Sequence, residues 1–124
     1  MLTIPHVLLK QAESQPDALA LQDGDVSLSY KELSSVVSQA AGILEASGVS
    51  KGDRFAIWAP NCAEWVIIAL AGQMIGGVLV TLNTRYKGSE AAEILRRSNC
   101  KMLFTVSGFL GQDYKASLDG FDLP

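Results

Sequence analysis

Three short segments rich in β-branched and aromatic residues recur at an even spacing in the second half of the chain. They are RFAIWA at 54–59, VLVTL at 78–82 and MLFTV at 102–106, so their starting positions lie 24 residues apart. Helix-like apolar patterns fill the two intervals. A crossover between parallel strands needs a dozen or more residues and is usually a helix. The spacing therefore predicts a parallel β-α-β-α-β unit.

The first half of the chain predicts a helix followed by a β-hairpin. We expect the helix to start near Thr3 and to end before Pro16. The two strands of the hairpin are expected at 19–22 and 26–29, on either side of an Asp-Gly-Asp turn at 23–25. Asp-Gly between strand-like runs is a strong signal for a tight hairpin turn.

Helix caps mark the boundaries of the next elements. Ser29 followed three residues later by Glu32 is a capping box, which predicts the start of a second helix that Gly48 closes. Asn61 and Glu64 repeat this spacing, so we interpret them as the cap of a third helix. The fold class that we predict is α/β, a β-hairpin plus a parallel β-α-β-α-β unit. After Val106 we expect no closing element, because the periodicity is lost.

Composition excludes several classes of function. The 124 residues are 48% hydrophobic and 19% charged, which is typical of a globular protein with a buried core. The net charge of −3 and a pI of about 5.0 argue against nucleic acid as the partner, since phosphate binding needs a concentrated positive surface. We predict no nucleic-acid binding.

The two cysteines, Cys62 and Cys100, are far apart in sequence, and the chain has one histidine, His6. This pattern encodes neither a metal site nor a disulfide framework. Free thiols fit a reducing compartment, so we predict a cytoplasmic protein. The first residues lack the positive start and the cleavage site of a signal peptide.

One segment raises the alternative of a membrane span. Residues 65–82 contain no charged residue, and as a helix they would reach almost across a bilayer. Their interior argues against this, because Gln73 is polar and the pair Gly76-Gly77 interrupts the helical pattern before strand-like residues begin. We expect a buried helix followed by a buried strand, and no transmembrane span.

Several blocks in these predicted elements resemble a known enzyme superfamily. The sequences are LSYKEL at 28–33, GQMIGGVLVTLN at 72–83 and TRYKGSEAAEIL at 84–95. In this order and spacing they resemble the start of an AMP-forming acyl-CoA synthetase of the adenylate-forming superfamily, which includes acyl- and aryl-CoA ligases, luciferases and peptide-synthetase adenylation domains. Thr81 and Thr84 depart from the pattern, since many relatives carry proline there.

The resemblance implies a two-step reaction. A carboxylic acid substrate, fatty or aryl/alicyclic, attacks ATP to give an acyl adenylate, and CoA then displaces AMP to form acyl-CoA. The full-length enzyme would use ATP, Mg²⁺ and CoA. The phosphate loop, the later nucleotide motifs and the C-terminal lysine domain of such enzymes are not among these residues, so residues 1–124 are expected to be an N-terminal fragment of the AMP-binding domain. We expect no catalytic residue, no bound cofactor and no activity in this chain alone.

Arg85 and Lys87 are the candidate binding residues. They follow a predicted parallel strand at its carboxyl end, where open α/β sheets place ligand-binding groups. The resemblance to CoA ligases implies that they contact a phosphate of CoA. The alternative is a structural role for Arg85, in which it caps carbonyl groups or pairs with Glu90 or Asp113. Trp65 is interpreted as a core residue.

Other functions stay open at this point. A stand-alone binding or interaction module on the same scaffold, an adenylation domain that loads a carrier protein, and a luciferase-like enzyme would share the fold. NAD binding is excluded because no G-x-G-x-x-G motif follows a strand. A three-stranded parallel sheet would leave backbone groups at its edges unpaired, so we expect a homo-oligomer formed through these exposed edges.

Overall fold

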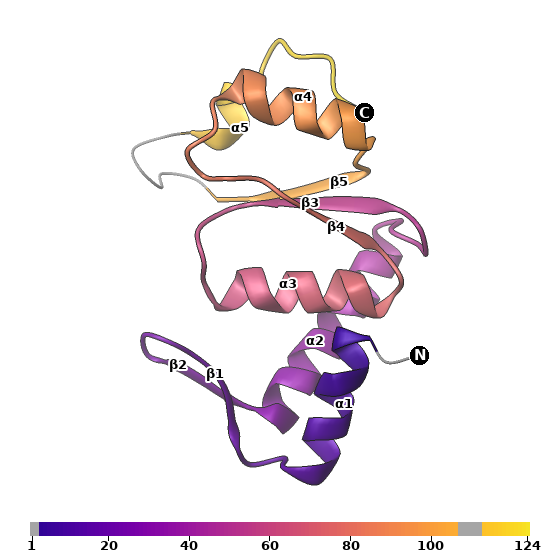
Figure 1. Ribbon diagram of the computed structural model, residues 1–124, viewed down its shortest axis with the longest axis vertical. Coiled ribbons are helices and arrows are strands. Elements are labelled where there is room, and N and C mark those ends of the chain that lie inside the picture. The colour runs from indigo at the N-terminus through magenta and orange to yellow at the C-terminus, as the bar shows by residue number, and fades with distance from the viewer. Residues whose placement is uncertain (1–2, 107–112) are drawn as a thin grey trace.

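The computed structural model describes residues 3–106 and 113–124 and is shown in Figure 1. The elements are α1 (Ile4–Ser14), β1 (Leu19–Asp23), β2 (Val26–Ser29), α2 (Tyr30–Ala46), β3 (Arg54–Trp58), α3 (Ala63–Met74), β4 (Val78–Thr81), α4 (Gly88–Ser98), β5 (Met102–Thr105) and α5 (Tyr114–Ser117). The predicted α/β fold is confirmed: β1 and β2 form an antiparallel hairpin, and β3, β4 and β5 form a separate parallel sheet.

The parallel sheet has the strand order β4-β3-β5, so the first strand of the unit lies in the middle. Its register pairs Arg54 with Val78 on one side and Phe55 with Met102 on the other. The chain passes from β3 to its neighbour β4 through α3, and then crosses back over β3 to β5 through α4. Figure 1 shows α3 on one face of the sheet and α4 on the other.

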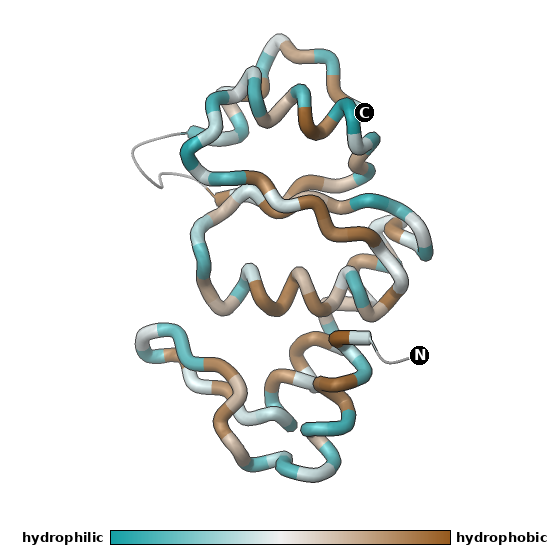
Figure 2. The backbone as a smooth tube through the Cα atoms, viewed as in Figure 1, coloured by the Kyte–Doolittle hydropathy of each residue, from teal (hydrophilic) through white to brown (hydrophobic). Residues whose placement is uncertain are grey.

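The side chains of β3 form the core of both layers. Phe55 and Ile57 point to the α3 side, whereas Ala56 and Trp58 pack with buried residues of α4. All four are at most 1% exposed. A strand that is covered on both faces has a continuous apolar sequence instead of an alternating one, as RFAIW does. Figure 2 shows the same hydrophobic run through the central strands and α3.

The predicted start of the first helix and the predicted capping box of the second are confirmed. Thr3 precedes α1 and its side chain accepts a hydrogen bond from the His6 amide. At α2, the Ser29 amide donates to Glu32 Oε1 at 2.9 Å and the Glu32 amide donates to Ser29 Oγ at 3.1 Å. The hydrogen bond from the Ser29 amide lowers the pKa of the Glu32 carboxyl. Gly48 follows α2 with a φ of 101°, which is the left-handed cap that the sequence indicated.

Two expectations about helices were wrong. Asn61 does not cap α3: the N-cap residue is Cys62, whose side chain makes no capping hydrogen bond. The chain also has a closing element, because α5 packs the buried ring of Tyr114 against the α4 layer. Both differences depend on contacts between residues distant in sequence, which a local pattern does not report.

The uncharged segment at 65–82 contains most of α3, the turn at Gly76 and β4. The expectation of a buried strand was wrong, because β4 lies at an edge of the sheet and its end residues Val78 and Thr81 are exposed. Within residues 3–106 and 113–124, the structure has no helix with the length and apolar character that crossing a bilayer would require.

Gly72 allows α3 to approach the sheet closely. A Cβ atom added there would lie 2.1 Å from Cζ of Phe55, a side chain with no solvent exposure. We predict that Gly72→Ala lowers the free energy of unfolding by about 1–3 kcal/mol, because the ring must move inside a close-packed core. Urea denaturation followed by circular dichroism measures the change.

Gly42 in α2 supplies the matched control, since an added Cβ would meet nothing within 4 Å. Gly42→Ala should raise the free energy of unfolding by about 0.5–1 kcal/mol, because alanine restricts the unfolded chain and favours a helix. If both substitutions were equally tolerated, the close approach of α3 to Phe55 would be contradicted.

Candidate functional site

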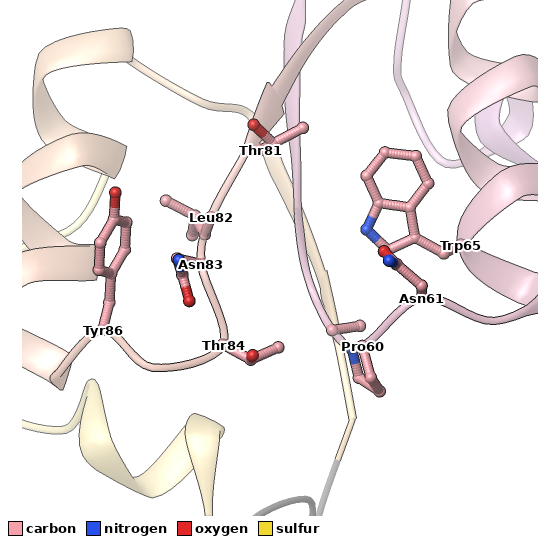
Figure 3. Close-up of a pocket in the computed structure, with 9 residues that line it drawn as sticks. Pro60, Asn61, Trp65, Thr81, Leu82, Asn83, Thr84 and Tyr86 are labelled. Atoms are coloured by element: carbon pink, nitrogen blue, oxygen red, sulfur yellow. The ribbon is translucent and has the colours of Figure 1, made fainter.

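A groove of about 580 Å³ lies between the carboxyl ends of β3 and β4. Figure 3 shows its two walls, one formed by the residues after β4 and the other by the loop after β3 together with the start of α3. Its lining residues are Ala59, Pro60, Asn61, Trp65, Thr81, Leu82, Asn83, Thr84 and Tyr86.

The topology explains why a groove forms at this place. After β3 the chain turns toward α3 on one face of the sheet, and after β4 it turns toward α4 on the opposite face. Because the two loops separate, they leave a crevice at the carboxyl ends of these neighbouring strands. Open α/β sheets bind ligands at such topological switch points. The groove is therefore the candidate functional site.

The wall after β4 is held in shape by Asn83. Its side-chain Oδ1 accepts a hydrogen bond from the Arg85 amide at 2.9 Å, and its carbonyl accepts one from the Tyr86 amide at 3.0 Å. The same carbonyl accepts a hydrogen bond from the indole Nε1 of Trp58 at 2.8 Å. A core tryptophan of the central strand thus fixes the loop that follows the edge strand.

Tyr114 of α5 is the second anchor of this wall. Its hydroxyl donates to the Thr84 carbonyl at 3.0 Å. The rings of Tyr114 and Trp58 pack edge to face, with centroids 4.6 Å apart and an interplanar angle of 73°. Both side chains are completely buried. Two part-buried hydrogen bonds and the aromatic packing therefore tie this loop to the core.

The opposite wall presents Pro60, Asn61 and Trp65 (Figure 3). Asn61 is exposed, whereas Trp65 is half-buried: it packs against the core cluster around Phe55, as expected, and also lines the groove. Among the described residues that line this groove, none carries a charged side chain. Its amides, hydroxyls and aromatic surface suit an uncharged, flat or polar group, and a phosphate would find no cation within it.

Arg85 and Lys87 both lie on the loop between β4 and α4 and are exposed. They do not line the groove, although both are sequence neighbours of Tyr86, which does. The Arg85 backbone is fixed through Asn83, and the Lys87 amide donates to Glu90 Oε1 at 2.9 Å.

Glu90 and Asp113, the acids named as possible partners of Arg85, each accept a hydrogen bond from a backbone amide. For Asp113 the donor is the Ala116 amide, at 3.0 Å from Oδ1. Among the ion pairs between described residues, none involves Arg85.

Cys62 lies at the start of α3, next to the groove. Burial raises the pKa of its thiol, so it carries little thiolate at neutral pH and is a poor nucleophile. In the part of the chain that the structure describes, no three His, Cys, Asp or Glu side chains come together in a way that could hold a metal ion.

Sequence reasoning missed the two anchors of the groove wall. Trp58 was recognised as a strand residue, but nothing in the sequence says where its indole N–H points. Tyr114 falls in a stretch without periodicity, so it gave no signal at all. Asn83 was part of a recognised block, and its position just after a strand is the one local signal that could have indicated a turn-forming side chain.

Comparison with known proteins identifies the family. The family model described as "AMP-binding enzyme" matches residues 8–122, which is nearly the whole chain. The chain belongs to the AMP-binding enzyme family. The resemblance seen in the sequence blocks is thereby confirmed.

The curated relatives are CoA ligases. The chain is 39% identical over 126 aligned residues to 3-[(3aS,4S,7aS)-7a-methyl-1,5-dioxo-octahydro-1H-inden-4-yl]propanoyl:CoA ligase of Rhodococcus jostii (strain RHA1). It is 42% identical over 122 residues to the ligase of the same name from Mycobacterium tuberculosis. Both alignments cover 98% of this chain but only 24% of the relative. A medium-chain acyl-CoA ligase from Mus musculus is 35% identical over 114 residues.

Solved structures show the same fold. The N-terminal domain of FACL13 from Mycobacterium tuberculosis superimposes with a TM-score of 0.82 at 30% identity, over 85% of this chain and 27% of that chain. The N-terminal subdomain of NpsA from Klebsiella oxytoca, in complex with anthranilyl-AMSN, gives a TM-score of 0.78 at 27% identity, over 82% of this chain and 27% of that chain. The predicted kinship to N-terminal subdomains of adenylate-forming enzymes is confirmed.

We predict that Tyr114→Phe loosens the wall after β4. The substitution keeps the ring but removes the hydroxyl that binds the Thr84 carbonyl, so the free energy of unfolding should fall by about 1–2 kcal/mol. Hydrogen exchange at the Tyr86 amide should also become faster, because the loop loses an anchor.

Tyr30→Phe is the control for this experiment, since the Tyr30 hydroxyl makes no hydrogen bond with a described residue and lies away from the groove. Equal effects of the two substitutions on Tyr86 exchange would show that the Tyr114 hydroxyl does not hold the loop.

Proposed function

We propose that residues 1–124 are the N-terminal part of the AMP-binding domain of an ATP-dependent acyl-CoA ligase, which forms an acyl adenylate and then acyl-CoA. The observation that carries this proposal is the identity of 39% and 42% with two CoA ligases over 98% of the chain. The acids in the names of these relatives are an alicyclic propanoate and, for the mouse enzyme, medium-chain acids. A fatty or aryl/alicyclic carboxylic acid is the substrate class that we assign.

The contribution of this chain to the reaction is structural and electrostatic. The described residues bring together no carboxylate cluster for Mg²⁺, and the sequence has no Ser/Thr/Gly-rich loop ending in lysine for the phosphates of ATP. We therefore derive no adenylation step from these residues. They fit CoA better, because Arg85 and Lys87 are exposed cations on either side of Tyr86, a lining residue of the groove, and such side chains suit a phosphate.

ATP–pyrophosphate exchange with a panel of medium-chain and alicyclic acids tests the proposed division of roles. The purified 124-residue chain should give no exchange, since the groups that stabilise charge on the transferred nucleotide are not in it. The complete ligase should exchange with at least one acid. Exchange by the 124-residue chain alone would overturn the claim that it lacks chemistry.

Arg85 supplies a second test, made in the complete ligase. We predict that Arg85→Gln raises the KM for CoA about fivefold, which corresponds to about 1 kcal/mol for a contact at an exposed site. The KM for ATP should not change. Arg97→Gln is the matched control, because Arg97 is an exposed arginine at the far end of α4 that pairs with Glu93 at 2.9 Å. A KM for CoA that responds equally to both substitutions would remove Arg85 from the CoA site.

An adenylation domain that loads a carrier protein is the second candidate. The likeness to NpsA favours it, since one of the NpsA structures is an artificially fused Adenylation-PCP di-domain that matches with a TM-score of 0.78 at 27% identity. Replacing CoA by a phosphopantetheinylated carrier protein in the same assay separates the two. Thioester formed only on the carrier protein would favour this candidate. If the complete protein binds ligand but shows no exchange activity, it is instead a stand-alone binding module.

The exposed edges of the sheet lead to a prediction about self-association. Within the described residues, β4 and β5 are each hydrogen-bonded on one side only, and Val78 is 47% exposed. Unpaired strand edges without protecting charges recruit further strands. We predict that the 124-residue chain forms dimers or larger species through these edges. Multi-angle light scattering that shows only monomer at high concentration would contradict this.

The cysteines support a proposal about the compartment. Cys62 and Cys100 are both free, and Cys100 is buried. Since unpaired thiols are kept reduced in the cytoplasm, we assign the protein to that compartment.

A further inference from the structure

The start of α3 is held by a residue from a distant part of the chain. Cys62, the N-cap residue, makes no side-chain capping bond. Instead, the amide of Ala63 donates to Oδ2 of Asp23 at 2.9 Å, across 40 residues of sequence. A carboxylate at this position satisfies one orphan amide of the first turn and lies at the positive end of the helix dipole.

The position of the Asp23 carboxylate is set by the hairpin. Asp23 is the last residue of β1 and pairs with Val26, across a turn in which Gly24 has a φ of 55°. The base of the hairpin is tied to the chain before it, because the Tyr30 amide donates to the Ala18 carbonyl at 3.0 Å. Figure 1 shows the tip of the hairpin reaching toward the beginning of α3.

The segment that Asp23 holds is also a wall of the groove. Pro60 and Asn61 lie between the end of β3 and Ala63, and Trp65 follows in the first turn of α3. All three line the groove. The opposite wall is anchored separately, through Trp58 and Tyr114.

We propose that Asp23 is a positioning residue that sets the width of the groove by fixing the Pro60–Trp65 wall through its bond to Ala63. The hairpin therefore does more than pack against the helices. It carries the carboxylate of Asp23, which positions one wall of the groove. This inference goes beyond the proposed function, since it concerns the geometry of the groove for any occupant.

Nuclear magnetic resonance of the ligand-free chain tests the proposal. In Asp23→Ala, exchange of the Ala63 amide should become about tenfold faster, as expected for loss of a charge-assisted hydrogen bond. The side-chain amide signal of Asn61 and the indole signal of Trp65 should move. The indole signal of Trp58 should stay in place, because its partner is the carbonyl of Asn83 on the other wall.

Two further variants separate positioning from general stability. Asp23→Asn keeps an acceptor oxygen in the same place and should restore the Asn61 and Trp65 signals. Asp25→Ala removes the neighbouring acid of the turn, which makes no hydrogen bond or ion pair with the described residues, and should leave all these signals unchanged.

If Asp23→Ala does not fold, Asp23→Glu gives the same information, since it keeps the charge but moves the carboxylate by one methylene. It should shift the Asn61 and Trp65 signals and leave Trp58 in place. The proposal is overturned if neither Asp23→Ala nor Asp23→Glu shifts the Asn61 and Trp65 signals. It is also overturned if the indole signal of Trp58 shifts as much as they do. Because no ligand is used, the result does not depend on whether the chain belongs to an acyl-CoA ligase.

Discussion

The burial of β3 on both faces and its pairing on both edges is the constraint on which the rest of the structure depends. Its neighbours β4 and β5 take their register from it, and the helices α3 and α4 pack on the alternate side chains that it presents. Trp58, at the end of β3, has a further role, because its indole N–H donates a hydrogen bond to the Asn83 carbonyl in the loop after β4. Core packing and the shape of the candidate site therefore share one residue.

The elements of the fold were predictable because their signals are local. An apolar run bounded by turns defines each parallel strand, and the serine and glutamate that start α2 are only three residues apart. The strand order and α5 had no such signal. They follow from packing between segments far apart in the chain, as when the Tyr114 ring meets Trp58.

The sequence indicated where in the fold a candidate site would lie, but not which residues would line it. A groove lies at the carboxyl end of β4, where the topology places ligand-binding groups, but Arg85, the residue predicted to bind there, is not among its lining residues. Asn61 was misread as a helix cap, because an asparagine before a helix has the same sequence signature whether its side chain bonds to the backbone or faces a groove. The first turn of that helix is bound instead by Asp23, which accepts a hydrogen bond from the Ala63 amide. The two residues are 40 positions apart, so no local motif could indicate this contact.

The Tyr114 anchor has a consequence for synthesis of the protein on the ribosome. Residue 84 leaves the exit tunnel 30 residues ahead of residue 114, whose hydroxyl binds its carbonyl. The central strand β3, with Trp58, emerges earlier still. The hydrogen bond from Trp58 to Asn83 can therefore form first, and the one from Tyr114 to Thr84 only after α5 has emerged. The groove wall therefore reaches its final shape late in translation of this segment, after the sheet that supports it is already available.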